Sequence, residues 1–158
     1  MKKIVQSQLT QYNSFFKEID EVYHSIARHY GISDCALWIL YIVRETEDDH
    51  TQNKLCELLS LSKQTVNSAL KKLEKEGYIK LEHHPGNQKN KLIQLTEQGS
   101  LFAGEMIDKL VKMEQTAFCH LSAEERITLL RLIEKYVNRL QKECKKLMIP
   151  EKSEENNS

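Results

Sequence analysis

The sequence predicts a mainly α-helical chain with one small β-hairpin, and three observations lead to this prediction. Apolar side chains in residues 62–76 recur at helical spacing and form one face, made of Val66, Ala69, Leu70 and Leu73. Residues 78–95 contain two alternating apolar segments around a polar, turn-rich tip, which is typical of a hairpin. Long amphipathic helical patterns occupy residues 10–30 and 122–147. We therefore expect a mainly α fold with a small hairpin and a helical arm.

The first two helices are expected on either side of Gly31, which ends the pattern of residues 10–30. Ser33 is a good N-cap for a second helix that extends from Asp34 to about Glu45. This second segment is apolar almost all round, which predicts a central position in the core.

Two short helices follow with only a tight connection between them. Thr51 is the expected N-cap of the first, whose inward residues would be Leu55, Leu58 and Leu59, and Ser62 is the expected N-cap of the second. This is the spacing of a helix-turn-helix over about residues 51–76, in which the second helix lies in a major groove. With the hairpin of 78–95 behind it, the sequence predicts a winged helix-turn-helix over residues 33–99.

Two long helices complete the expected fold. Thr96 caps the first, with an inward face predicted to contain Leu101, Phe102, Met106, Ile107, Leu110 and Val111. Ser122 and Glu125 form a capping box before the second, which spans roughly 35–40 Å from Ser122 to Leu147. Its apolar stripe is too broad for one monomer to cover, so helices 10–30 and 122–147 are expected to form a two-fold homodimer. Residues 150–158 read as a disordered polar tail.

The exposed stripe of residues 62–76 has the chemistry of a DNA-reading helix. Its amides can pair with adenine edges, its hydroxyls are permissive partners, and its lysines can meet phosphates or guanine. Residues 62–91 hold seven lysines against three glutamates, although the whole chain has a net charge of +0. This local surplus predicts salt-sensitive binding of double-stranded DNA. The expected contacts are Ser62, Lys63, Gln64, Thr65, Asn67, Ser68, Lys71, Lys72, Asn87, Lys89 and Lys91.

The rest of the sequence narrows the class of protein. The length of 158 residues fits a single unit, 1–158, and no signal peptide or membrane-spanning run is apparent, which predicts a cytoplasmic protein without a membrane partner. The four cysteines lack CxxC spacing and read as reduced thiols. There is no phosphate loop, GxSxG or HExxH motif, so we expect neither an enzyme nor a bound cofactor or metal.

The layout resembles the MarR family of bacterial transcriptional regulators over about residues 10–147. The most specific matches are LSKQTVNSALKKLEKEGYI at 61–79 and LIQLTEQG at 92–99. The resemblance implies a homodimer whose terminal helices interlock and whose recognition helices enter successive major grooves of a pseudo-palindromic operator. It also implies a repressor released by a small molecule, often a phenolic or other aromatic acid, or by oxidation.

Two features depart from the family pattern. The family wing usually carries Asp-x-Arg, and the matching positions here are Asn87 and Lys89, with Lys91 nearby. A lysine lacks the guanidinium fork of arginine, which predicts either weaker anchoring in the minor groove or anchoring that Lys91 shares. Peroxide-sensing relatives use a cysteine in the first helix, but residues 10–30 contain none and the nearest is Cys35.

A small aromatic or acidic ligand, if there is one, is expected where the first, second and fifth helices meet the base of the wing. This expectation rests on the aromatic residues Tyr12, Phe15, Phe16, Trp38, Tyr41 and Phe102. Two alternative functions remain at this point. One is a thiol-redox-sensing regulator of the same fold, and the other is a winged-helix adaptor that binds proteins.

Overall fold

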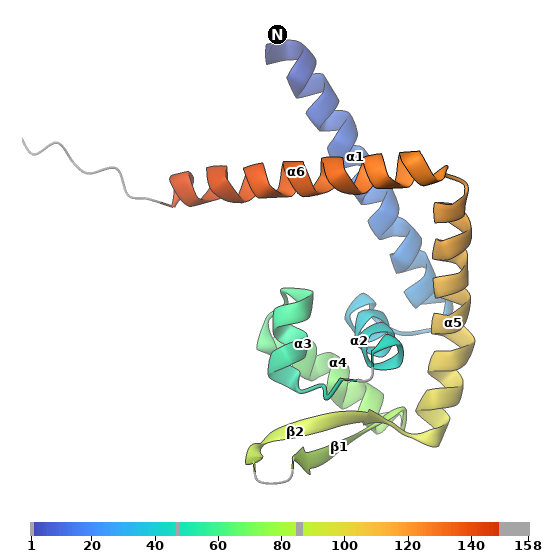
Figure 1. The fold of residues 1–158 in the computed structure, drawn as a ribbon. Helices are drawn as coiled ribbons and strands as arrows, with labels where there is room; N and C mark the ends of the chain where they lie inside the picture. Colours follow the sequence, from blue (N-terminus) through green and yellow to red (C-terminus); the bar gives the residue numbers. More distant parts are fainter. Residues whose placement is uncertain (1, 47, 85–86, 149–158) are drawn as a thin grey trace, which may run out of the picture. The chain divides into compact units, whose positions relative to one another are not determined.

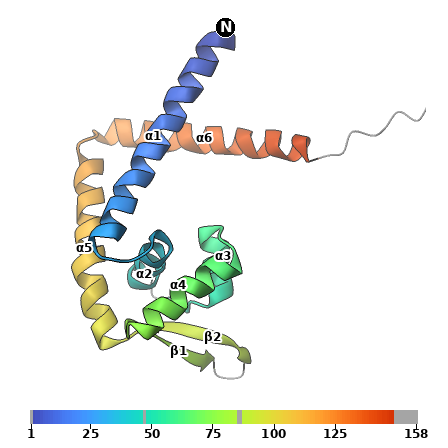
Figure 2. The same cartoon turned by 180° about the vertical axis from the view of Figure 1, so that it is seen from behind.

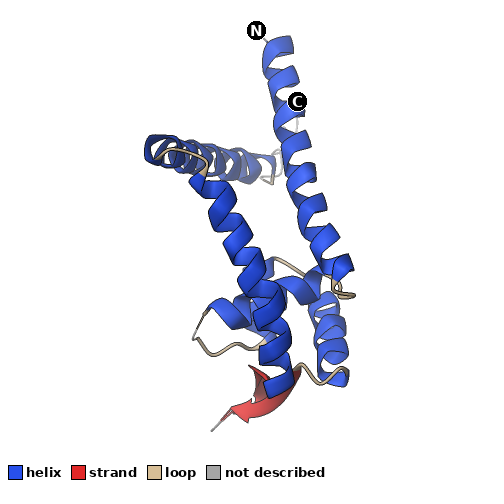
Figure 3. Cartoon of the chain, turned by 90° about the vertical axis from the view of Figure 1, so that its right-hand side faces the viewer, coloured by secondary structure: helices blue, strands red, loops and turns tan. Residues whose placement is uncertain are grey.

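The computed structural model of the chain describes residues 2–46, 48–84 and 87–148, and the side chains of 83–90 lie outside its description. The fold class is confirmed: helices dominate this part of the chain, with one antiparallel hairpin (Figure 1 and Figure 3). The predicted tail at 150–158 lies outside the described residues. In order, the elements are α1 (Lys2–His29), α2 (Asp34–Glu45), α3 (Gln52–Leu59), α4 (Lys63–Lys75), β1 (Ile79–His84), β2 (Asn87–Leu95), α5 (Glu97–Cys119) and α6 (Ala123–Leu147).

The chain divides into two compact units, residues 1–111 and 112–158, with the boundary inside α5. The core of the first unit is built around α2, which buries Ala36, Leu37, Ile39 and Leu40 and packs against α1 and α4. Each large apolar side chain buried in this way contributes about 1.5–3 kcal/mol. The core is completed by residues from the other elements: Ala27, Ile32, Leu55, Val66, Ala69, Leu70, Leu73, Ile79, Ile93, Ala103, Met106, Ile107 and Leu110.

The expected helix caps are confirmed. The side chains of Ser33, Thr51 and Ser62 accept backbone N–H groups at the starts of α2, α3 and α4, respectively. Ser122 and Glu125 form both hydrogen bonds of the capping box at the start of α6. These short-range bonds satisfy donors that have no partner inside the helix, which is why residue type alone located them.

Two leucines expected to face inward are exposed. Leu58 is 55% exposed, because α3 has only two turns and buries a narrow stripe centred on Leu55. Leu101 is 73% exposed, because it lies on the side of α5 opposite the buried Leu110, nine residues further along the helix. At about 100° per residue, nine residues place the two side chains on opposite sides of a helix.

Two elements are longer than expected. Helix α1 begins at Lys2 and not near residue 10, since Ile4, Val5 and Leu9 continue its apolar pattern among polar residues. In the hairpin, β1 continues to His84 and β2 begins already at Asn87. The pairing of the two strands shifts register between His83 and His84. Strand pairing needs only backbone groups, so it continues past the apolar residues that predicted it.

The second unit is formed by the end of α5 and by α6. No residue of α6 is buried, although it carries a regular apolar stripe at Leu130, Ile133, Val137 and Leu140. The spacing of three and four residues between these positions is that of a helix that packs against another helix.

Candidate nucleic-acid interface

Helix α4 presents one buried face and one polar face. Val66, Ala69, Leu70 and Leu73 are buried, and they fix the helix on the core of the first unit. On the other side, Asn67 is half-buried and the remaining predicted contacts of α4 are exposed: Lys63, Gln64, Thr65, Ser68, Lys71 and Lys72. The polar stripe expected from the sequence is therefore open to a large partner.

The beginning and end of α4 are fixed by local geometry. The Ser62 hydroxyl accepts the backbone N–H of Thr65 at 3.1 Å and also contacts the Thr65 hydroxyl at 2.8 Å. Gly77 follows the last turn with φ +78°, a conformation that glycine adopts without strain. The chain then turns directly into β1, which places the hairpin beside α4 (Figure 2).

The hairpin is attached through β2 to the segment that leads into α3, and its base is closed by hydrogen bonds. The N–H of Ile93 in β2 donates to the His50 carbonyl at 2.9 Å, and Thr51 forms a bridge with Leu92. At the base, the Thr96 hydroxyl donates to the Gly77 carbonyl, and the Thr96 N–H donates to the Tyr78 carbonyl at 3.1 Å. The wing is therefore held in a defined position relative to α3 and α4.

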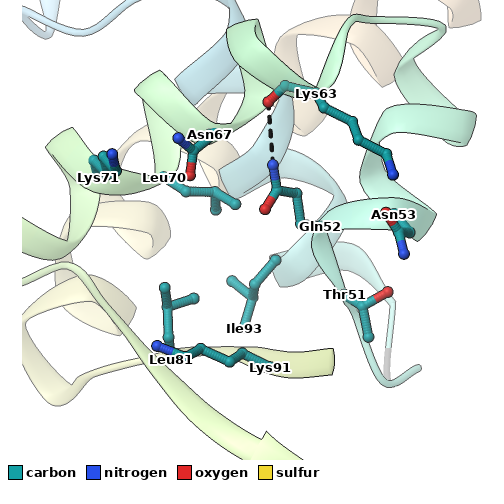
Figure 4. Close-up of a pocket in the computed structure, with 10 residues that line it drawn as sticks. All are labelled: Thr51, Gln52, Asn53, Lys63, Asn67, Leu70, Lys71, Leu81, Lys91 and Ile93. Carbon is teal, nitrogen blue, oxygen red and sulfur yellow. Dashed lines mark hydrogen bonds between the residues drawn. The ribbon is translucent and has the colours of Figure 1, made fainter. Parts of the chain in front are cut away.

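A groove of about 380 Å³ lies between α3, α4 and the hairpin (Figure 4). Its apolar surface comes from Leu70, Leu81 and Ile93, and three lysines from two elements surround it, Lys63 and Lys71 from α4 and Lys91 from β2. Among the described residues, these three lysines form no ion pair with an acid. The remaining residues that line it are Thr51, Gln52, Asn53 and Asn67. A groove with three uncompensated ammonium groups and several amides is suited to an anionic, hydrogen-bonding polymer.

The predicted contacts do not all face this groove. The ammonium group of Lys72 lies 3.4 Å from the Gly31 carbonyl and 3.8 Å from Glu76, so the side chain turns toward the α1–α2 connection. The side chains of Asn87 and Lys89 lie outside the described residues, and their contribution stays a prediction.

Sequence reasoning missed the first turn of α3. Thr51, Gln52 and Asn53 line the groove, and Gln52 donates from Nε2 to the Lys63 carbonyl at 3.1 Å. The polar Thr-Gln-Asn start of this helix was the available signal, because the first helix of a helix-turn-helix crosses the DNA backbone.

The aromatic residues expected to line a ligand pocket form separate groups. Tyr12 contacts Phe16 at a ring distance of 4.7 Å, Trp38 contacts Tyr41 at 5.6 Å, and Phe102 stacks on Tyr78 at 4.2 Å. Phe15 is 51% exposed. Trp38 instead lines an apolar cavity of about 520 Å³ with residues of α2, α3 and the start of α4: Asp34, Cys35, Leu58, Leu59, Leu61 and Thr65.

The cysteine environment bears on thiol sensing. Burial raises the pKa of the Cys35 thiol, and the neighbouring Cys56 adds to the effect. A raised pKa lowers the thiolate fraction, and the thiolate is the reactive form. Cys119 and Cys144 are exposed. The geometry thus gives Cys35 the character of a packing residue.

The described part of the chain contains no cluster of three or more His, Cys, Asp or Glu side chains suited to a metal ion. Nor does any helix there combine the length and apolar character needed to cross a bilayer.

His50 lies at the attachment of the wing and is 3% exposed. Its Nε2 lies 2.7 Å from the Thr46 hydroxyl, which itself donates to the Ile42 carbonyl at 2.9 Å. The hydroxyl has one proton, so Nε2 must be the donor to Thr46, and Nδ1 is left as a buried acceptor without a partner among the described residues. Burial lowers the pKa of His50, Lys54 lowers it further, and Asp48 and Asp49 oppose the shift.

This environment predicts a loss of stability in mild acid. Because the folded-state pKa lies below the unfolded value of about 6.5, the unfolded chain binds the proton more readily. The stabilisation by neutral His50 is therefore complete above about pH 6.5 and declines as pH falls toward the folded-state pKa. We expect urea unfolding between pH 7.5 and pH 5 to show a smaller decline for His50→Gln, which keeps a donor but does not titrate. Equal declines for the variant and the wild type would contradict this assignment.

Comparison with known proteins gives a consistent result. The family model described as MarR family matches residues 30–89. A curated relative, the uncharacterized HTH-type transcriptional regulator YwhA of Bacillus subtilis (strain 168), is 27% identical over 132 residues, which cover 84% of this chain and 91% of the relative.

Two solved structures share the fold. A MarR family regulator from Neisseria meningitidis, NMB1585, has a TM-score of 0.73 and 22% identity, covering 88% of this chain and 97% of that chain. The S. aureus MepR–DNA complex has a TM-score of 0.70 and 22% identity, covering 83% of this chain and 96% of that chain. At these identities the structures establish the fold of the chain and nothing finer.

Proposed function

We propose that this chain, whose residues 30–89 match the MarR family model, is a homodimeric DNA-binding repressor that reads a pseudo-palindromic operator and is released by a small-molecule ligand. The observation that carries the proposal is the groove between α3, α4 and the hairpin, in which three lysines lie beside the polar stripe of α4. A protein-binding adaptor would instead need exposed aliphatic or aromatic side chains on that stripe. Because the target of such a regulator is chromosomal DNA, the proposal implies that it acts in the cytoplasm.

The proposed DNA contacts of α4 and β2 divide into two roles. Gln64, Thr65, Asn67 and Ser68 contact base edges, while the lysines mainly contact phosphates: Lys63, Lys71, Lys72, Lys89 and Lys91. Lys72 can join them only by leaving its present contacts with Gly31 and Glu76.

Substitutions at two neighbouring positions test this division. Asn67→Ala should cost roughly 1–3 kcal/mol of binding free energy on the operator and relax preference at one or two base pairs. Lys71→Ala should weaken binding to all sequences about equally and reduce the salt slope by about one unit. Affinities over a panel of operator point mutants at several salt concentrations would measure both effects. The same profile for both variants would rule out separate roles.

The proposed dimer interface consists of the apolar faces of α1 and α6. Ile19 and Val22 in α1 are 50% and 48% exposed, and Leu130 and Leu140 in α6 are 57% and 54% exposed. Regularly spaced apolar side chains on long helices are typical of surfaces that another helix covers. A second copy of the chain, related by a two-fold axis, would cover these faces and present two α4 helices to one operator.

The proposed ligand is a small aromatic or acidic molecule that binds near the aromatic residues of the first unit. Trp38 contacts Tyr23 at a ring distance of 4.7 Å and also contacts Tyr41. Binding of a ligand near this site should therefore change the fluorescence of Trp38. A ligand releases DNA only if it binds the free and DNA-bound forms with different affinity. A tenfold loss of DNA affinity requires a difference of about 1.4 kcal/mol.

Titration of a panel of aromatic acids tests the ligand proposal. Trp38 is the single tryptophan, so its quenching reports binding without a label. A ligand that releases DNA must bind the DNA complex more weakly than the free protein, by the same factor. Equal ligand affinity in the presence and absence of operator would contradict this switch.

A further inference from the structure

We propose that Gln52 is a positioning residue, which holds the first turn of α4 in the orientation needed to read bases. The inference rests on the proposed function of α4 as the DNA-reading helix. Gln52 belongs to α3 and lies outside the stripe expected from the sequence. Its side-chain Nε2 donates to the Lys63 carbonyl at 3.1 Å, which ties the first turns of the two helices together (Figure 4).

The first turn of α4 has no buried side chain of its own. Lys63, Gln64 and Thr65 are all exposed, and the first buried residue is Val66, with 0% exposure. Apolar packing therefore fixes the helix from Val66 onward. The turn that carries two of the proposed base contacts, Gln64 and Thr65, extends beyond that packed region.

The contacts available to this turn are few. The Ser62 cap bonds to Thr65 within the same turn, so it shapes the turn without fixing its position against other elements. Across elements, the Cys35 thiol lies 4.0 Å from the Thr65 carbonyl. A thiol is a weak donor, and this distance is long. Within the described residues, the amide of Gln52 is the stronger side-chain link to a first-turn carbonyl.

The two kinds of DNA contact differ in their tolerance of a small movement. Pairing with base edges depends on distance and direction, as for any directional hydrogen bond. A lysine on a flexible stem acts on a phosphate as a point charge and can follow it. Loss of the link from Gln52 should therefore reduce discrimination between sequences and leave general affinity for DNA nearly unchanged.

Gln52→Met is the informative variant. Methionine has a similar length and a similar helix propensity, but it has no donor for the Lys63 carbonyl. Asn53→Leu is the matched control, because it removes an amide from the next position of the same turn in the same groove. In the described residues, Asn53 has no hydrogen bond to α4.

The probes are a duplex enriched by the wild-type protein from a random-sequence library and a scrambled duplex of the same composition. We expect the ratio of the two affinities to fall about fivefold in Gln52→Met, as for the loss of one hydrogen bond. The salt slope should stay unchanged. Asn53→Leu removes a groove amide that, in the described part of the chain, has no bond to α4, so it should lower the affinities for both duplexes to the same extent and keep their ratio. Gln52→Glu, which has an acceptor in place of the donor, should reduce the ratio at least as much as Gln52→Met.

A panel of operator point mutants separates positioning from direct contact. If Gln52 acts by positioning α4, Gln52→Met should reduce the base preference at every base pair where substitutions of Gln64 or Thr65 also reduce it. Relaxation at one other base pair would show that Gln52 itself reads a base, and an unchanged affinity ratio would show that the link is dispensable; either result overturns the inference. If the wild type showed no sequence preference at all, the proposed function would fail first.

Discussion

Gly99→Ala is expected to destabilise the first unit by about 4 kcal/mol or more, among the largest effects of a single substitution. A Cβ atom at Gly99 would lie 1.7 Å from the carbonyl oxygen and 2.6 Å from the carbonyl carbon of Tyr78. These are backbone atoms, so no side-chain rotation relieves the overlap. The same carbonyl accepts the N–H of Thr96 at the base of the hairpin. Moving it would therefore detach the wing from α5.

Gly104→Ala is the matched control in the same helix. Its Cβ would lie 3.3 Å from the end of the flexible Arg44 side chain, which can shift by a few tenths of an ångström. Alanine also favours the helix by about 1 kcal/mol over glycine. Urea unfolding at one protein concentration should thus show a change of no more than about 1 kcal/mol for Gly104→Ala. If Gly99→Ala changed the free energy of unfolding as little as Gly104→Ala, the close approach of Gly99 to the Tyr78 carbonyl would be contradicted.

The double substitution Ile133→Glu and Val137→Glu is expected to convert the protein into a monomer. Both side chains belong to the apolar stripe of α6 and are 40% and 41% exposed in the single chain. Burying two carboxylates without partners in a helix interface costs far more than the apolar contacts return. Sedimentation equilibrium should give a mass near 18.5 kDa for the variant and twice that value for the wild type.

The loss of the dimer should also weaken operator binding by at least about a hundredfold, because the second half-site then no longer binds intramolecularly. Asn138→Glu with Lys142→Gln is the control, since it lowers the charge of α6 by the same two units on the polar side. This control should remain a dimer. A monomeric wild type, or a dimeric Ile133→Glu/Val137→Glu variant, would exclude α6 as the interface.

The parts of the fold that depend on neighbouring residues were predictable from the sequence. Ser33, Thr51, Ser62 and Ser122 each act on a backbone N–H a few residues away, so residue type and spacing identify them. The buried face of α4 was also predicted, because four apolar residues at helical spacing leave one arrangement that buries them all.

The features that the sequence did not reveal depend on contacts between distant segments. The bond from Gln52 to Lys63 and the turn of Lys72 toward Gly31 require the packing of separate elements. The aromatic side chains looked like one group in the sequence, yet the packing of α1 and α2 pairs Trp38 with Tyr23. Leu101 differs for a simpler reason: its apolar character predicts burial, but its angle around the helix places it opposite the buried Leu110.

The most direct test of the central claim is selection of DNA by the wild-type protein from a random-sequence library. A dimer that places two α4 helices in successive major grooves should enrich a two-fold-symmetric sequence, with half-site centres about 10–10.5 base pairs apart. Asn67→Ala should reduce the base preference at one or two positions in each half-site and leave the distance between the half-site centres unchanged. A selection that enriched no sequence, or a preference that Asn67→Ala and Lys71→Ala left unchanged, would contradict DNA reading by α4.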